Sequence, residues 1–417
     1  MDTTRGQGVS RAEAHIIWIL WATYGAFYFC RTNISAGLPG LQAELELSKA
    51  EIGTILGGLK LAYGLGQFVN GQLAERVPAR LLLAIGMFSS AVLNVLFGLG
   101  TGFYFLLFVW AANGYFQSMG WTPCMKVASR WFPPAHRGRA IGLIGTGYQL
   151  AGAVTFVVSG WSAELLGWRG AHFIPAGMLA LMGVFTLVAL REDPDDARPA
   201  RPVSVAGGDG RWTHTVWITV SNPRLWLIAL ALGLDDATRY GFIDWGITHL
   251  TEVTGGGVGK NALKYAVLPL GGIAGAFGAG WASDRWFGGR RVPVVVALLL
   301  TLGVLSLLYH DAVESNVALS VALLGFIGFC VYGPQVLLVG SAAMDVARAG
   351  RPAAAVGFVN LFGYLGAFMG DQVTGYLAGS HTWSAAVNFW AICAFAAAVI
   401  LLPLWRYSAV GRAREPA

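Results

Sequence analysis

The stretch REDPDDARPARPVSVAGGDGR, residues 191–211, divides the chain into two halves of similar length. It is polar, rich in Pro and Gly, and without apolar periodicity, which is typical of a flexible linker. On each side lie six apolar segments of roughly 20 residues, the length that a helix needs to cross a bilayer. These twelve expected spans lie near 16–38, 51–73, 81–100, 103–127, 140–163, 171–190, 223–250, 261–282, 292–310, 316–343, 353–378 and 383–405.

This pattern predicts an all-α membrane protein with twelve transmembrane helices in two pseudo-symmetric six-helix bundles. We expect an N-terminal bundle over residues 1–190, a cytoplasmic linker over 191–222 and a C-terminal bundle over 223–417. Because each chain would hold both bundles and so a complete cavity between them, we expect a monomer.

The composition agrees with a membrane protein. Of the 417 residues, 55% are hydrophobic and only 12% are charged, whereas soluble domains carry about 25% charged residues. The net charge of +6 does not indicate a nucleic-acid partner, because the arginines cluster in short loops between apolar runs. The four cysteines show no metal-like spacing, and no nucleophile–base arrangement is present. We therefore expect neither an enzyme nor a metal or cofactor site.

The distribution of Lys and Arg predicts the orientation. One set of segment ends carries most of the arginines, and the opposite set carries only Lys49, Arg169, Lys260 and Lys264. Since positive loops stay in the cytoplasm, we expect both termini and the linker to be cytoplasmic, in the inner (plasma) membrane of a bacterium.

The two halves also repeat each other. GQLAER at 71–76 recurs as GWASDR at 280–285, and the charge Arg31 in the first span recurs as Arg239 in the seventh. An internal repeat of this length is typical of transporters whose site lies near the midplane between two related bundles.

Few charges fall inside the expected spans. A charge at mid-membrane costs at least ~2.5–3.5 kcal/mol, so such residues face the interior of the bundle and usually have a partner. Arg31 and Arg239 occupy matching places in the two halves, and guanidinium binds phosphate or carboxylate through two hydrogen bonds. We interpret them as an anion clamp. The alternative, neutralisation by a neighbouring carboxylate, is stronger for Arg239, because Asp235 and Asp236 lie one helical turn earlier.

Other polar side chains are candidates for the same cavity. Lys60, Tyr63 and Gln67 share one face of the second span, and Lys60 would be either a third cavity cation or a lysine that reaches the membrane interface. Tyr28 lies beside Arg31, and Tyr148 falls in a Gly-rich fifth span. Two carboxylates are also candidates for the cavity wall: Asp236 and Asp371.

Several stretches resemble a known family over nearly all of the chain, from about residue 16 to 405. The most specific are YFCRTNISAGLPGL (28–41), AYGLGQFVNGQLAER (62–76), GYFQSMGWTPCMKVASRWF (114–132) and RYGFIDWGITHL (239–250). They are similar to the organophosphate:phosphate antiporters of the major facilitator superfamily, such as glycerol-3-phosphate and hexose-phosphate transporters. The resemblance implies a rocker-switch antiporter in which Arg31 and Arg239 bind inorganic phosphate and an organophosphate in turn.

The sequence departs from that family at three places. Gln67 stands where the relatives have a lysine, Tyr148 where the glycerol-phosphate transporter has a histidine, and Asp236 where a neutral residue is expected. If Asp236 or Asp371 lines the cavity, either carboxylate could receive a cationic group. The substrate would then be zwitterionic, such as an aminophosphonate.

Other functions stay open from the sequence. A proton-coupled symporter of an organic anion is the main alternative, since several aspartates could titrate. A non-transporting sensor of phosphate esters is disfavoured, because we expect no signalling domain in the short linker or beyond Ala417. Drug efflux fits two buried arginines poorly. The motif charges are predicted to form gating pairs that hold an outward-facing state: Glu75, Arg76, Asp284 and Arg285.

Overall fold

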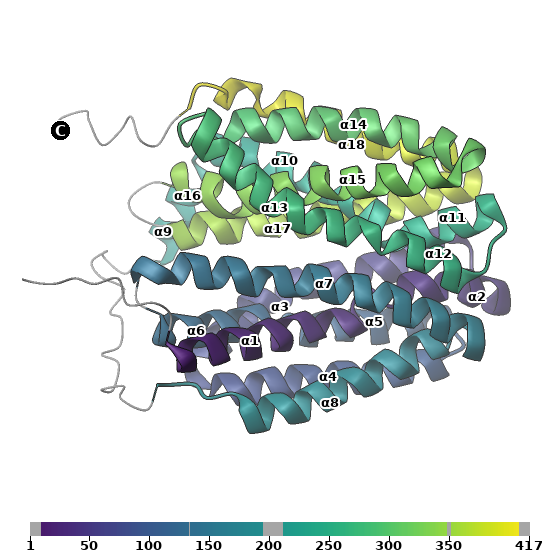
Figure 1. Ribbon diagram of the computed structural model, residues 1–417, viewed down its shortest axis with the longest axis horizontal. Helices are drawn as coiled ribbons and strands as arrows, with labels where there is room; N and C mark the ends of the chain where they lie inside the picture. Colours follow the sequence, from purple (N-terminus) through teal and green to yellow (C-terminus); the bar gives the residue numbers. More distant parts are fainter. Residues whose placement is uncertain (1–9, 133, 195–211, 348–351, 408–417) are drawn as a thin grey trace, which may run out of the picture.

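The computed structural model describes residues 10–132, 134–194, 212–347 and 352–407, so most of the predicted linker lies outside it. Within these residues the chain is helical throughout, with no strand. The helices run along the long axis of the molecule in two groups, one formed by α1 to α8 and the other by α10 to α18 (Figure 1).

The first group corresponds to the first six predicted spans. Its elements are α1 (Arg11–Ala26), η1 (Phe27–Cys30), α2 (Ile34–Leu45), α3 (Lys49–Arg76), α4 (Ala79–Leu99), α5 (Phe103–Gln117), α6 (Trp121–Trp131), α7 (Pro134–Leu166) and α8 (Gly170–Ala189). The first span is interrupted by the 3₁₀ turn η1, and the fourth is interrupted between α5 and α6.

The second group holds the last six spans. Its elements are α10 (Pro223–Tyr240), η2 (Gly241–Trp245), α11 (Gly246–Thr254), α12 (Val258–Tyr265), α13 (Val267–Trp286), α14 (Arg291–Ser315), α15 (Val317–Leu337), η3 (Leu338–Ala342), α16 (Ala343–Asp345), α17 (Pro352–Ser380), α18 (Trp383–Leu401) and η4 (Leu402–Leu404). A short helix that the sequence analysis did not predict, α9 (Trp212–Val220), lies within the expected linker.

Nine helices of the described residues are long and apolar enough to cross a bilayer. A tenth span is counted if His214–Val220 and Pro223–Thr254, which meet at 71°, are taken together. The two remaining predicted spans are the interrupted ones, α1–η1–α2 and α5–α6. The predicted all-α fold with two six-helix bundles is therefore confirmed.

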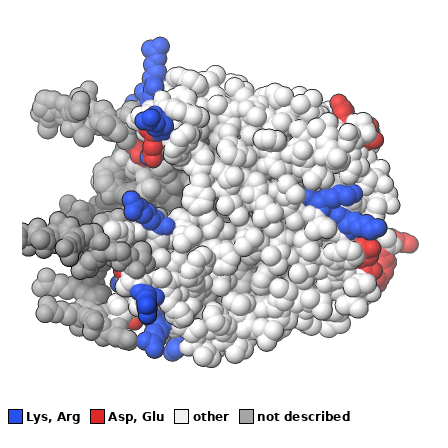
Figure 2. Space-filling model, viewed as in Figure 1, with Lys and Arg blue, Asp and Glu red and all other residues white. Residues whose placement is uncertain are grey.

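Charged side chains gather at the two ends of the molecule, and a broad uncharged band separates them (Figure 2). We call the end at which α3 finishes and α10 begins the linker side, and the end at which α3 begins and α17 finishes the far side. Ser48 fixes the far-side start of α3, because its hydroxyl and the Glu51 carboxylate cap each other's backbone amides.

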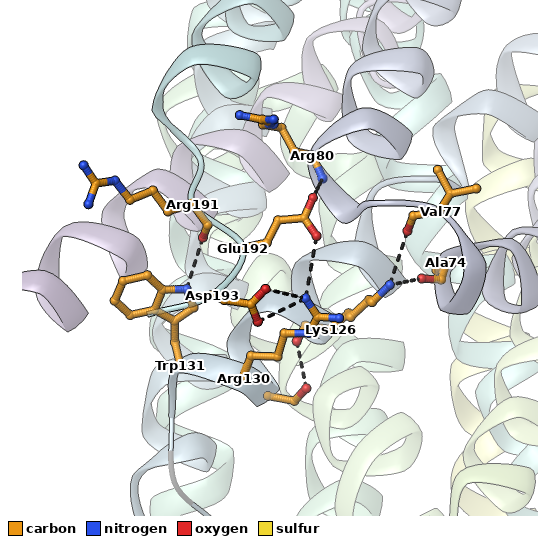
Figure 3. Close-up of polar contacts among 10 residues, drawn as sticks. Ala74, Val77, Arg80, Lys126, Arg130, Trp131, Arg191, Glu192 and Asp193 are labelled. Atoms are coloured by element: carbon orange, nitrogen blue, oxygen red, sulfur yellow. Dashed lines mark hydrogen bonds and ion pairs between the residues drawn. The ribbon is translucent and has the colours of Figure 1, made fainter. Parts of the chain in front are cut away.

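The two repeated motifs belong to the ends of long helices. GQLAER forms the last turns of α3, and GWASDR those of α13. Lys126 on α6 closes the end of α3 by donating to the carbonyl oxygens of Ala74 at 2.5 Å and Val77 at 3.2 Å (Figure 3). Its charge therefore satisfies helix-end carbonyls that lack an intrahelical donor.

Candidate functional site

A cavity of about 370 Å³ lies between the two groups of helices. Both groups contribute to its wall, chiefly through α3 and α7 on one side and α10, α15 and α17 on the other. Its polar lining includes tyrosines, amides and one ion pair: Tyr24, Tyr28, Tyr63, Tyr148, Tyr364, Gln67, Gln149, Gln335, Asn360, Asp236 and Arg239. An aromatic, amide-rich wall with one guanidinium among its lining groups suits a small anion that carries a polar organic group.

Arg239 lies near the end of α10 and lines this cavity. Its Nη1 donates to Asp236 Oδ1 at 2.7 Å, and Asp236 lines the cavity as well. The Arg239 guanidinium also packs over the ring of Tyr240, 4.7 Å from its centroid. Arg239 is therefore partly neutralised by Asp236, and its Nε is a buried donor without a partner among the described residues.

Arg31 lies just after η1 and is almost completely buried. Its guanidinium sits 4.7 Å from the ring centroid of Tyr28 and 4.4 Å from that of Tyr63. Both tyrosines line the cavity and Arg31 itself does not. The structure thus places the charge of Arg31 behind two aromatic rings, which are favourable neighbours for a desolvated cation.

The partner of Arg31 is an amide, Gln117 at the end of α5. Arg31 Nε donates to Gln117 Oε1 at 3.2 Å, and Nη2 to the Gln117 carbonyl oxygen at 3.4 Å. No carboxylate pairs with Arg31 among the residues that the structure describes. The neutralisation alternative therefore holds for Arg239 and not for Arg31.

Gln117 is held in turn by residues that the sequence analysis missed. Its Nε2 donates to Ser90 Oγ at 2.7 Å, and Ser90 Oγ bonds Asn113 Oδ1. Asn113 Nδ2 donates at 2.8 Å to the carbonyl oxygen of Cys30, which η1 leaves without a helical partner. The sequence did mark Gln117, Ser90 and Asn113, since each is a polar side chain inside an apolar span.

Tyr148 and Gln67 line the cavity and contact residues of the other half across it. The Tyr148 ring stacks on Tyr28 with 5.0 Å between centroids, and its hydroxyl lies 3.5 Å from Gln335 Oε1 across the cavity. Gln67 Oε1 accepts from Asn360 Nδ2 at 2.8 Å. The structure therefore brings both predicted residues into the cavity wall.

Lys60 and Asp371 are predicted site residues that do not line the cavity. Lys60 Nζ lies 2.5 Å from Asp371 Oδ2 and also pairs with Asp244. Lys60 is 2% exposed, so it neither adds a cation to the cavity nor reaches the membrane interface. Asp371 is correspondingly unable to receive a substrate cation in this conformation.

The two halves meet on the far side of the cavity. Besides the Lys60 contacts, Lys49 pairs with Glu252 at 2.6 Å, and Glu164 Oε2 accepts from the Gly259 amide at 2.7 Å. Glycines allow this approach: a Cβ on Gly53 would lie 2.5 Å from the carbonyl oxygen of Asp371. The cavity consequently lies toward the linker side of a closed contact.

The predicted gating charges are not paired across the halves. Asp284 bonds Arg291 at 2.5 Å, within the second half. Among the described residues, no ion pair involves Glu75, Arg76 or Arg285. Separately, the described residues contain no group of three or more metal-ligating side chains. These charges were predicted to hold the outward-facing state, in which the linker side is closed. The present structure is closed on the far side instead, so their gating role stays a prediction.

The sequence of the chain is similar to known membrane proteins. The family model described as Major Facilitator Superfamily matches residues 20–370. The chain is 30% identical to the membrane sensor protein UhpC of Escherichia coli K12, over 93% of this chain and 91% of that one. It is 30% identical to a probable hexose phosphate transport protein of Chlamydia muridarum (95% and 91%) and 28% identical to a glycerol-3-phosphate transporter of Bacillus subtilis (92% and 90%).

Solved structures share the fold at lower identity. A bacterial homolog of the human lysosomal transporter Spinster, inward-facing and unoccupied, superimposes with a TM-score of 0.73 at 17% identity, covering 98% of this chain and all of that one. The nucleoside transporter NupG gives a TM-score of 0.71 at 14% identity, covering 96% of this chain and 100% of that one.

Proposed function

Because the chain belongs to the major facilitator superfamily and, within it, to the organophosphate:phosphate antiporter family, we propose that it exchanges an organophosphate or phosphonate anion for inorganic phosphate. Exchange takes place by rocker-switch alternating access, in which the two six-helix bundles tilt about the cavity between them. The chain is a multi-pass membrane protein and not an enzyme.

The observation that carries the proposal is the pair of buried arginines, one from each half. Arg31 has no carboxylate partner among the described residues, so the centre of the molecule holds positive charge that a bound anion can compensate. A phosphate group accepts hydrogen bonds from several donors at once, and it matches the planar guanidinium. An anion that bridges both halves lowers the cost of moving the uncompensated charge of Arg31, which favours exchange over net transport.

The cavity wall indicates the order in which an anion meets the two arginines. Arg239 lines the cavity, whereas Arg31 lies behind Tyr28 and Tyr63. We infer that phosphate first meets Arg239 and the tyrosine hydroxyls. A rotation of the two rings then brings Arg31 onto the same anion as the halves close over it. Tyr148, Gln67 and Asn360 are placed to bind the organic part.

The asymmetry of positive charge supports a cytoplasmic linker side, since positively charged loops are retained there. In this orientation the cavity lies toward the cytoplasm and the contacts around Lys60 close the outside. The conformation is therefore inward-facing.

The test is exchange in proteoliposomes. Vesicles loaded with inorganic phosphate are given labelled external phosphate, with unlabelled glycerol-3-phosphate, hexose phosphates, aminoethylphosphonate and a dicarboxylate as competitors. We expect rapid exchange that Arg31→Lys and Arg239→Lys each reduce at least tenfold. Arg169→Lys is the matched control, because Arg169 pairs with Glu44 on the far-side surface. Net uptake of phosphate into phosphate-free vesicles at the same rate would contradict obligatory exchange.

Two other functions give different results in the same vesicles. A proton-coupled symporter of a carboxylate or phosphate ester would take up its substrate along an imposed proton gradient without internal phosphate. A phosphate-ester sensor, suggested by the similarity to UhpC, would bind the ester in detergent, with binding lost in Arg31→Lys, and would catalyse no exchange.

A further inference from the structure

Three charged side chains meet between the halves, outside the cavity. Lys60 on α3 contacts Asp244 on η2 and lies 2.5 Å from Oδ2 of Asp371 on α17. All three side chains are at most 3% exposed. One ammonium and two carboxylates carry a net charge of −1 when all three are ionised.

No second cation contacts these carboxylates among the described residues. Arg239 attracts Asp244 electrostatically, but its own ion pair is with Asp236. The other groups that face the cluster are uncharged: the ring of Tyr240 lies 4.9 Å from Lys60 Nζ, and Trp245 lies beside Asp371.

Arg31 is held by Gln117 and packs against the ring of Tyr63. Oδ1 of Asp371 makes no hydrogen bond of normal geometry among the described residues, although the side chain of Trp245 lies beside Asp371. A buried negative charge without a partner is costly, and two carboxylates that share one site rarely ionise together.

We propose that Lys60, Asp244 and Asp371 form a proton-binding site that is complete only when the two halves are closed on the far side. One proton on the carboxylate pair gives –COOH, –COO⁻ and –NH₃⁺, and so a net charge of zero. The pair holds the proton jointly, as coupled sites do.

Closure creates the site because its parts come from different halves. Lys60 belongs to the first half, and both aspartates belong to the second. Separation of the halves on this side exposes the carboxylates to water, where each can ionise independently and the proton leaves. The closed state therefore binds one more proton than the open state, so low pH on the far side favours closure.

The proton acts on the gate and is not cargo. None of the three residues lines the cavity. Tyr63 on α3 and Tyr364 on α17, whose ring centroids are 4.7 Å apart, lie on the cavity side of the cluster. The proton consequently enters and leaves on the far side. Transport then depends on the pH of that side without moving protons across the membrane.

The inference rests on the proposed alternating access and not on the identity of the anion. Its test needs no substrate, so its failure is distinguishable from failure of the exchange assay. Spin labels are placed at Leu165→Cys on α7 and Ser380→Cys on α17, both exposed and one in each half. The four natural cysteines are all buried. Distances are measured by pulsed electron paramagnetic resonance in lipid nanodiscs between pH 5 and 9.

We expect a short distance at low pH and a growing population at longer distance as the pH rises. For one linked proton, the ratio of the two populations changes by at most about tenfold per pH unit. Asp371→Asn and Asp244→Asn each leave one carboxylate with Lys60 and are neutral without a proton, so in both the short distance should persist to pH 9.

The matched control removes the Lys49–Glu252 pair, which crosses the same interface but is balanced in charge. Lys49→Gln combined with Glu252→Gln should keep the wild-type pH dependence. A wild-type distance that does not change with pH would overturn the proposal, and so would an unchanged pH response in both aspartate variants. Exchange that dissipates an imposed pH gradient in the wild type, but not in Asp371→Asn, would overturn the gating role by making the proton a cargo.

Discussion

Arg239 Nη1 lies 2.7 Å from Asp236 Oδ1, one turn earlier on the same helix, and both side chains line the cavity. Its counterpart in the first half, Arg31, is bound instead by the neutral amide of Gln117. The two arginines therefore repeat in sequence but differ in electrostatics. The cavity is asymmetric, with a compensated arginine on one wall and an uncompensated one behind the other.

Asp236→Asn removes the negative charge at Arg239 and keeps an oxygen that can accept its hydrogen bond. We expect inorganic phosphate to bind roughly tenfold more tightly, which corresponds to about 1.4 kcal/mol. A zwitterionic competitor should gain less, because it loses a partner for its cationic group. Competition curves in the exchange assay measure both effects. Asp235→Asn is the control, since Asp235 is buried but does not line the cavity, and weaker phosphate binding in Asp236→Asn alone would show that the carboxylate mainly orients Arg239.

Substitutions of Gln117 test the uncompensated state of Arg31. Gln117→Leu removes one acceptor of the guanidinium, and a hydrogen bond to a charged group contributes about 1.5–3 kcal/mol. We expect a KM for phosphate about tenfold higher with exchange retained. Gln117→Glu has the same size but gives Arg31 the carboxylate that it lacks, so it should abolish exchange. Equal activity of the two variants would mean that the charge at Arg31 is not used.

Gly53→Ala tests the close approach of α3 and α17. The new Cβ would lie 2.5 Å from the carbonyl oxygen of Asp371, and overpacking of this kind costs about 1–3 kcal/mol. Only the state closed on the far side bears this cost, so the population should shift toward opening there by roughly 5–150-fold. The spin-label distances described above report the shift. Gly177→Ala, at a position where a Cβ meets no atom within 4 Å, should leave the distances unchanged.

Asp284→Asn tests the predicted gate on the linker side. In the present conformation Asp284 bonds Arg291 and is largely exposed, and a surface pair contributes about 0–1 kcal/mol. We expect the variant to favour the inward-facing state by losing a contact made in the outward-facing one. Cysteine labelling from the linker side measures the population, with Glu75→Gln as the equivalent change in the first half. Accessibility that stays at the wild-type level in both variants would remove these motifs from gating.

The element pattern could be predicted because it depends on local properties. Apolar segments of sufficient length, a polar linker and arginines at segment ends predicted the two bundles. The breaks within the first and fourth spans were not predicted, since η1 is stabilised by Asn113, on a different span. The same holds for Gln117: its polarity was visible in the sequence, but its contact with Arg31 was not.

The sequence by itself determined the membrane fold, the two-half repeat and the pair of matching arginines, because hydropathy and charge act along the chain at short range. Only the tertiary structure decided which charges meet. Lys60 and Asp244 are 184 residues apart, and nothing local distinguishes Lys60 from a cavity lysine or an interfacial one. Burying a charge without a partner is costly, so a buried charge pairs with an opposite charge that the packing of the helices brings close, however distant in the sequence. The closed far side, the two rings over Arg31 and the three-charge cluster therefore follow from how the halves pack together.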